Sequence, residues 1–257
     1  MMDYQTAVRG AFFDIAGVAE TPDEVAAQAR YLDDGLLFLR DGKIIALLPW
    51  LEGEAFLHPL KGYVDQRGKL LLPGFVDTHI HYPQTEMIGA FGEQLLEWLT
   101  TYTFPVESQF ADADYAQEIA QFFVNQLISH GTTTALVFCT LHPASAEALF
   151  SEALRLNMRL IAGKVMMDRH VPDYLCETAG ESYEQTRELI LRWHQRGRLG
   201  YAITPRFAPT STPALLEAVQ RLRTEFPDTW LQTHLSENRE EIAWVKQLWP
   251  EHARYLD

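Results

Sequence analysis

Cysteine and basic residues are both scarce in this sequence. Two cysteines, Cys139 and Cys176, cannot build a disulfide framework in 257 residues, which indicates a reducing, cytoplasmic location. There are 21 lysines and arginines against 35 aspartates and glutamates, which gives a formal net charge of −14. Nucleic acids and anionic membranes are bound by basic surfaces, so this balance argues against both as partners.

Long apolar runs and several common motifs are missing too. No stretch approaches the ~20 consecutive apolar residues of a transmembrane helix. The first residues, MMDYQTAVRG, lack the basic and apolar regions of a signal peptide. There is no C-x-x-C, G-x-S-x-G or Walker-type loop, which leaves thiol redox, serine-hydrolase and P-loop chemistry without support. We therefore expect a soluble cytoplasmic protein.

The first 69 residues have the pattern of a small β domain. Two apolar runs flank Asp41-Gly42, a strong hairpin signal. Residues 20–30 are rich in alanine and glutamate and predict a short helix. A further turn is expected at Arg67-Gly68. No flexible linker separates this domain from residues 70–257.

From residue 70 the pattern alternates between apolar strands and amphipathic helices, which predicts a parallel sheet buried on both faces. Helices are expected at 115–130 and 145–157, and others begin at Ser182, Thr212 and Ser236. A doubly wound sheet is one candidate, but the G-x-G-x-x-G turn is absent after the first strand. We favour a (β/α)₈ barrel of the TIM type, with about five βα units in this chain. Five units cannot close a barrel, so we expect a longer parent chain.

A candidate metal site lies at the ends of two predicted strands. In LLPGFVDTHIH, His79 and His81 alternate along an extended chain and therefore point to the same side. His234, in THLSE, ends the fifth predicted strand. Three histidines at the carboxyl edge of a barrel suit a catalytic zinc ion, which takes three protein ligands and keeps one open position. Glu237 is placed to carry protons beside that ion.

Two other residues are candidates for substrate binding, each with a plainer alternative. Arg206 ends the fourth predicted strand, where its guanidinium can bind a carbonyl or anionic oxygen, or form a structural salt bridge. The Gln84 amide can bind the edge of a heterocycle, or simply be solvated. We interpret Lys164 as structural and Cys139 as a buried apolar residue.

Several segments carry a resemblance to a known family. LLPGFVDTHIH and THLSEN resemble the first-strand and fifth-strand signatures of the amidohydrolase superfamily. DTHIHYPQTE, EWLTTYTFPVE, GKVMMDRHVPDYL and PRFAPTS resemble its guanine deaminase branch. The resemblance implies a (β/α)₈ barrel with a β-sandwich assembled from both chain ends. It also implies a cytoplasmic homodimer with one zinc ion per subunit that deaminates guanine to xanthine and ammonia in purine catabolism.

The resemblance also implies roles for individual residues. His79, His81 and His234 bind the metal, and Glu237 carries the proton. The substrate contacts are Gln84, Arg206, Phe207, His234 and Glu237. A sixth-strand histidine and an eighth-strand aspartate of the family, the latter a metal ligand and base, would lie beyond Asp257. The fourth strand ends in Thr204-Pro205-Arg206 and not in the lysine of two-metal relatives, which favours one metal ion.

Two alternatives to this function stay open at this point. One is another amidohydrolase, a deaminase or chlorohydrolase that acts on a pyrimidine, triazine or adenosine-type ring. The other is a truncated module without turnover. The hydrogen-bond donors of Arg206 and Gln84 suit a purine oxygen and so favour guanine over the other rings, and the length of the encoded reading frame separates the truncated module from an enzyme.

Overall fold

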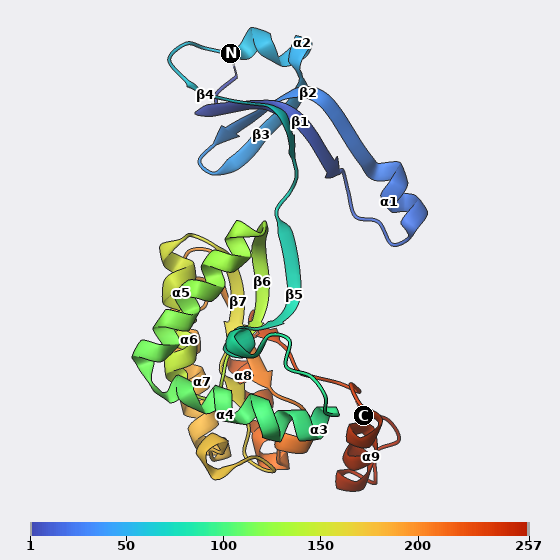
Figure 1. Ribbon diagram of the computed structural model, residues 1–257, viewed down its shortest axis with the longest axis vertical. Coiled ribbons are helices and arrows are strands. Elements are labelled where there is room, and N and C mark those ends of the chain that lie inside the picture. The colour runs from blue at the N-terminus through green and yellow to red at the C-terminus, as the bar shows by residue number, and fades with distance from the viewer. Residues whose placement is uncertain (1, 256–257) are drawn as a thin grey trace. The chain divides into compact units, whose positions relative to one another are not determined.

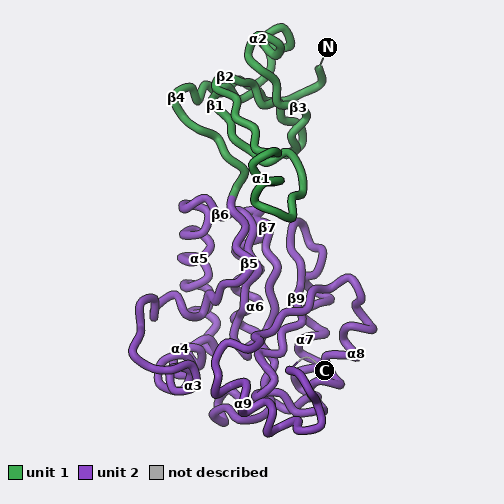
Figure 2. Tube along the Cα trace, turned by 90° about the vertical axis from the view of Figure 1, so that its right-hand side faces the viewer, with its two compact units in different colours: residues 1–74 green, residues 75–257 purple. Residues whose placement is uncertain are grey.

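The computed structural model describes residues 2–255. The chain divides between Gly74 and Phe75 into two compact units (Figure 2). The helices and strands are β1 (Thr6–Ile15), α1 (Pro22–Gln28), β2 (Ala29–Arg40), β3 (Lys43–Pro49), α2 (Trp50–Gly53), β4 (Gly62–Leu71), β5 (Phe75–His81), α3 (Leu95–Trp98), α4 (Phe104–Ser108), α5 (Ala113–Ser129), β6 (Thr132–Phe138), α6 (Pro143–Arg155), β7 (Arg159–Gly163), β8 (Val165–Met166), α7 (Ala179–Trp193), β9 (Leu199–Pro205), α8 (Pro213–Glu225), β10 (Trp230–Leu231) and α9 (Arg239–Leu248). In the part described, no helix is both long enough and apolar enough to cross a bilayer.

The first unit is a four-stranded sheet in the order β3-β2-β1-β4. Its β2–β3 hairpin turns at Asp41 and Gly42, which both have positive φ, as a tight hairpin turn requires, so this prediction is confirmed. The predicted short helix is also present as α1, which begins with a capping box between Thr21 and Glu24. That this sheet belongs to a β-sandwich stays a prediction.

The expected turn at Arg67-Gly68 is wrong. Both residues lie inside β4, where the pairing with β1 jumps from Arg9–Asp65 to Ala11–Leu70. The extra residues form a bulge, and Gly68 takes the positive φ that this requires. A glycine in a turn and a glycine in a bulge look the same in the sequence. Only the pairing with the neighbouring strand shows which of the two is present.

The second unit is built on parallel strands in the order β10-β9-β7-β6-β5, with β8 paired to β9. Each new strand is added on the same side of the previous one, so the order never reverses as it does in a doubly wound sheet. This is the winding of a (β/α)₈ barrel, and it confirms the predicted fold class. Figure 1 shows α5, α6 and α7 following one another beside these strands.

The core of the second unit lies between its helices and its central strands. All seven residues of β9 are buried, as are the last four of β7. Large apolar side chains from the helices, such as Phe123, Leu149 and Leu222, complete this core. The strands at the two edges are different, because most of β5 and both residues of β10 are exposed or half-buried.

Two predicted helix starts need correction. The helix expected from Ser182 begins earlier, because Thr178 and Glu181 form the capping box and α7 starts at Ala179. The helix expected from Ser236 begins at Arg239, capped by Asn238. Ser236 has a positive φ, a conformation unlike the extended backbone of an N-cap residue.

Candidate metal centre and substrate cavity

Two of the three clustered histidines come from β5. Pro73 and Gly74 separate this strand from β4, so the chain can leave one unit and start the next without continuing the strand. The strand then runs to His81, and the Asp77 carboxylate accepts a hydrogen bond from the His79 amide at 3.0 Å. The two imidazole centroids lie 5.3 Å apart, at the carboxyl end of the strand.

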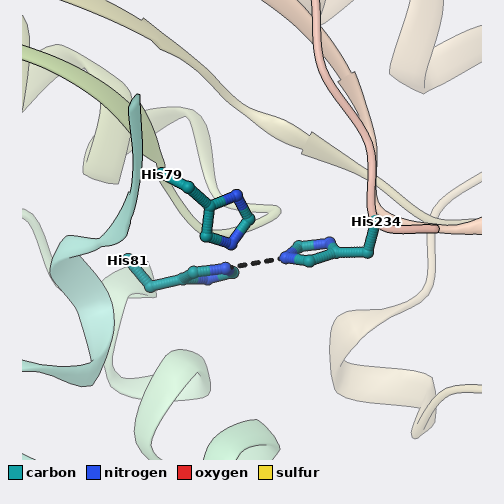
Figure 3. Close-up of side chains that lie close together, drawn as sticks. All are labelled: His79, His81 and His234. Atoms are coloured by element: carbon teal, nitrogen blue, oxygen red, sulfur yellow. Dashed lines mark hydrogen bonds between the residues drawn. The ribbon is translucent and has the colours of Figure 1, made fainter. Parts of the chain in front are cut away.

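The third histidine, His234, follows β10 and is held by the residue that follows β9. Its backbone amide and its Nδ1 both contact the Arg206 carbonyl oxygen, at 2.9 and 2.8 Å. Its Nε2 lies 2.9 Å from Nε2 of His81 (Figure 3). The Phe138 ring packs against the three imidazoles, at centroid distances of 4.4 to 5.0 Å.

The cluster has the properties of a metal site. One nitrogen from each of His79, His81 and His234 lies within 4.8 Å of the others. Zinc–nitrogen bonds are about 2.0–2.1 Å long, so two nitrogens on one ion lie at most about 4.2 Å apart, and the 4.8 Å limit of this cluster is slightly wider than that spacing. Burial lowers the pKa of His81 well below its usual value and lowers that of His234 to about 4. Both imidazoles are therefore neutral at pH 7, which is the form that binds metals.

An unsatisfied atom in the same cluster also fits a metal ligand. Nδ1 of His81 is buried, and it has no hydrogen-bond partner among residues 2–255. A buried polar nitrogen without a partner is costly unless the ring has another use. The three residues predicted as ligands are thus together, and their donor set fits a metal ion.

A cavity of about 220 Å³ opens beside the histidines. All seven residues predicted for the site contribute to its wall, which is completed by Leu95, Trp98 and Leu99: they are His79, His81, Gln84, Arg206, Phe207, His234 and Glu237. Its volume is below the ~300–1,000 Å³ of sites for drug-sized ligands, and suits one small ring system.

Glu237 lines this cavity from the segment between β10 and α9. Partial desolvation of its carboxyl raises its pKa, and the like charge of Glu241 adds to the shift. The Glu241 carboxylate in turn accepts a hydrogen bond from the Glu237 amide at 2.7 Å. A carboxyl group with a raised pKa beside a metal site suits proton transfer at neutral pH.

Arg206 satisfies both interpretations left open by its sequence position. Its side chain lines the cavity, and its Nη1 donates to both oxygens of Glu107, at 2.9 and 2.7 Å. Glu107 was not identified from the sequence. It lies 99 residues away in α4, at the end of the segment EWLTTYTFPVE, which carried the family resemblance but suggested no role for this glutamate.

The remaining predictions concern residues outside the cavity. Lys164 forms a buried ion pair with Glu177 at 2.6 Å, which confirms a structural role. Cys139 is fully buried, as predicted. Asp168, for which no role was predicted, accepts a hydrogen bond from the Thr212 amide and so holds the start of α8.

The parallel strands in barrel order and the histidine cluster at their carboxyl ends define a barrel-type protein whose strand ends carry three histidines that could hold a metal ion. The chain belongs to the Amidohydrolase family, whose sequence profile matches residues 70–257. It is 57% identical to guanine deaminase of Escherichia coli K12 over 251 residues, which are 98% of this chain and 57% of that protein.

Solved structures give the same relationship. An E. coli guanine deaminase structure superposes with a TM-score of 0.96 at 56% identity, over 98% of this chain and 58% of that one. Guanine deaminase from C. acetobutylicum, with guanine bound in its active site, superposes with a TM-score of 0.87 at 32% identity, over 97% of this chain and 57% of that one. The chain thus spans little more than half the length of these relatives.

Proposed function

We propose that the protein to which this chain belongs is a zinc-dependent guanine deaminase, which hydrolyses guanine to xanthine and ammonia. The observation that carries the proposal is the cavity wall itself. It combines a three-histidine cluster, a carboxyl group with a raised pKa and two side chains that can donate hydrogen bonds to a purine edge. The identity to guanine deaminases supports this substrate.

His79, His81 and His234 are proposed to hold one zinc ion, because neutral imidazoles are good ligands for it. When bound, the ion supplies a water activated for attack at neutral pH. The family's further histidine and aspartate, expected beyond Asp257, would complete this centre.

The other cavity residues are proposed to bind and protonate the ring. Arg206 and the Gln84 amide donate hydrogen bonds to the purine, and the Phe207 ring packs against its face. As the water oxygen bonds to the carbon that carries the amino group, Glu237 would take the two protons of that water in turn: it would pass the first to the neighbouring ring nitrogen and the second to the amino group, which leaves as ammonia when its bond to carbon breaks. A homodimer and a place in purine catabolism stay predictions from the resemblance, and a cytoplasmic location stays a prediction from the composition of the sequence.

The test is to incubate the natural-length protein with guanine, adenine, cytosine and a chlorotriazine, and to measure release of ammonia or chloride. We expect ammonia from guanine alone. Turnover of another ring without turnover of guanine would replace the substrate. No turnover of any of them by a zinc-loaded protein would favour a module without catalytic activity.

A further inference from the structure

The Arg206–Glu107 ion pair is buried directly behind the cavity wall. The two side chains are 3% and 0% exposed, and a single nitrogen, Nη1, contacts both carboxylate oxygens. Burial raises the pKa of the Glu107 carboxyl, while Arg206 and the side chain of Gln84 favour its ionised form. A guanidinium does not lose its proton in proteins, and Nη1 donates to both oxygens of Glu107, so each oxygen acts as an acceptor and we assign the pair as ionised.

The rest of the guanidinium remains available to a ligand. Among residues 2–255, Nε and Nη2 of Arg206 have no hydrogen-bond partner, and the side chain lines the cavity. Its orientation is fixed by Glu107 on one nitrogen and by the Phe104 ring, whose centroid is 5.5 Å from Cζ. Arg206 can therefore donate N–H groups to a ligand in the cavity, while Glu107 already compensates its positive charge.

A guanidinium that is already paired with a carboxylate prefers different ligands from an unpaired guanidinium. An arginine without a partner binds carboxylates and phosphates through its two-pronged fork, because opposite charges attract strongly in a dry site. Here a carboxylate already occupies part of that fork. A second anion would approach the Glu107 charge at close range, whereas a neutral carbonyl oxygen accepts the same hydrogen bonds without that repulsion.

We propose that Glu107 is a positioning residue that sets specificity: by neutralising and orienting Arg206, it makes the cavity select a neutral lactam carbonyl and reject an anionic group at the same place. This inference rests on the proposed function for the assumption that a purine occupies the cavity. Gln84, which contacts both the cavity and Glu107, belongs to the same arrangement.

The test compares two ligands that differ in charge at the position facing Arg206. Hypoxanthine offers a neutral lactam oxygen there, and purine-6-carboxylate offers an anion. Their dissociation constants are measured by calorimetry on the zinc-loaded, natural-length protein, so the result does not depend on turnover. We expect the unmodified protein to prefer hypoxanthine.

In Glu107→Gln the amide keeps the shape of the side chain but removes its charge. We expect the ratio of the two dissociation constants to move toward purine-6-carboxylate by about tenfold or more. If guanine is a substrate, its KM should rise more than its kcat falls, because the pair acts in binding. Glu97→Gln, an exposed change in the neighbouring helix α3, is the matched control and should leave the ratio unchanged.

Glu107→Asp keeps the charge and provides the second variant. It should still prefer hypoxanthine, even if it binds both ligands more weakly. An unchanged ratio in Glu107→Gln, or a preference for the anion in Glu107→Asp, would overturn the inference. A protein that shows the expected ratios but does not deaminate guanine would overturn the proposed function instead.

Discussion

The two sides of the cavity are built in different ways. On one side, Arg206 follows the fully buried strand β9 and is fixed by a buried partner. On the other, His79 and His81 come from β5, an edge strand whose residues are exposed or half-buried. The orientation of Arg206 is therefore set by a partner within this chain, whereas β5 lies at the edge of the described sheet, where a closed barrel would add a neighbouring strand. We infer that the histidine side depends more on what is added to it, namely the metal ion and that neighbouring strand.

The largest effect is expected on the histidine side. Replacing His79 and His81 together by alanine in the natural-length protein should abolish both metal content and deamination, because a three-ligand site does not tolerate the loss of two ligands. Metal analysis and an ammonia assay measure the result. His252→Ala, which changes an exposed histidine outside the cluster, should keep both. A zinc-replete double variant would show that the ligands have been misassigned.

The second effect separates proton transfer from metal binding. Glu237→Gln should lower kcat by about 10²–10⁴-fold, the usual contribution of a general acid–base group, and leave the zinc content unchanged. Single-turnover kinetics and metal analysis on one sample give both values. Glu240→Gln alters an exposed carboxylate nearby and serves as the control. Loss of zinc from the Glu237 variant would mean that this residue is a ligand.

The third effect tests how firmly packing fixes the Arg206 side. Glu107→Ala leaves a buried guanidinium without its partner, which should lower the free energy of unfolding by about 3–5 kcal/mol. Urea denaturation measures this change. Arg192→Gln breaks the exposed ion pair with Glu147 and should have little effect. If the two variants were equally stable, the buried pair would not be what holds this side.

The smallest effect is a dependence of stability on pH in the metal-free protein. The pKa of His234 is about 4 in the folded state, below the ~6.5 of an unfolded chain. Between these values the unfolded state binds more protons, so stability should fall as the pH decreases from about 6.5 to about 4. Thermal unfolding in the presence of a chelator measures the slope. His234→Asn should reduce the slope but not remove it, because the pKa of His81 is lowered as well, and an unchanged slope would assign the titration to other groups.

The sequence was most informative where the position of a residue in its own strand also decides where it lies in the folded protein. Parallel strands place their carboxyl ends at one edge, so His79, His81 and His234 could be brought together without knowing any contact. Glu107 could not be found in this way, because its pairing with Arg206 depends on how the short helix α4 folds back over the strand ends.

The predicted helix starts were wrong for a related reason. Ser182 and Gln185 have the same spacing as Thr178 and Glu181, and residue types alone do not rank the two capping boxes. The choice is made by which residues the helix must bury against the core, such as Leu189 and Trp193. The sequence pattern thus predicted where the helices lie along the chain, whereas tertiary packing decides the residue at which each helix begins.

The contact between His81 and His234 determines where the ring protons sit before an ion arrives. Nδ1 of His234 faces the Arg206 carbonyl oxygen and so carries the proton, which leaves its Nε2 with a free lone pair. Nε2 of His81, 2.9 Å away, must then be the protonated nitrogen. His234 therefore offers Nε2 to an ion, whereas the lone pair of His81 lies on Nδ1, the buried nitrogen without a partner among residues 2–255. An ion bound by Nδ1 of His81 leaves its proton in place, whereas an ion bound by its Nε2 requires a tautomer exchange, and the ¹⁵N chemical shifts of the two His81 nitrogens on metal uptake distinguish these routes.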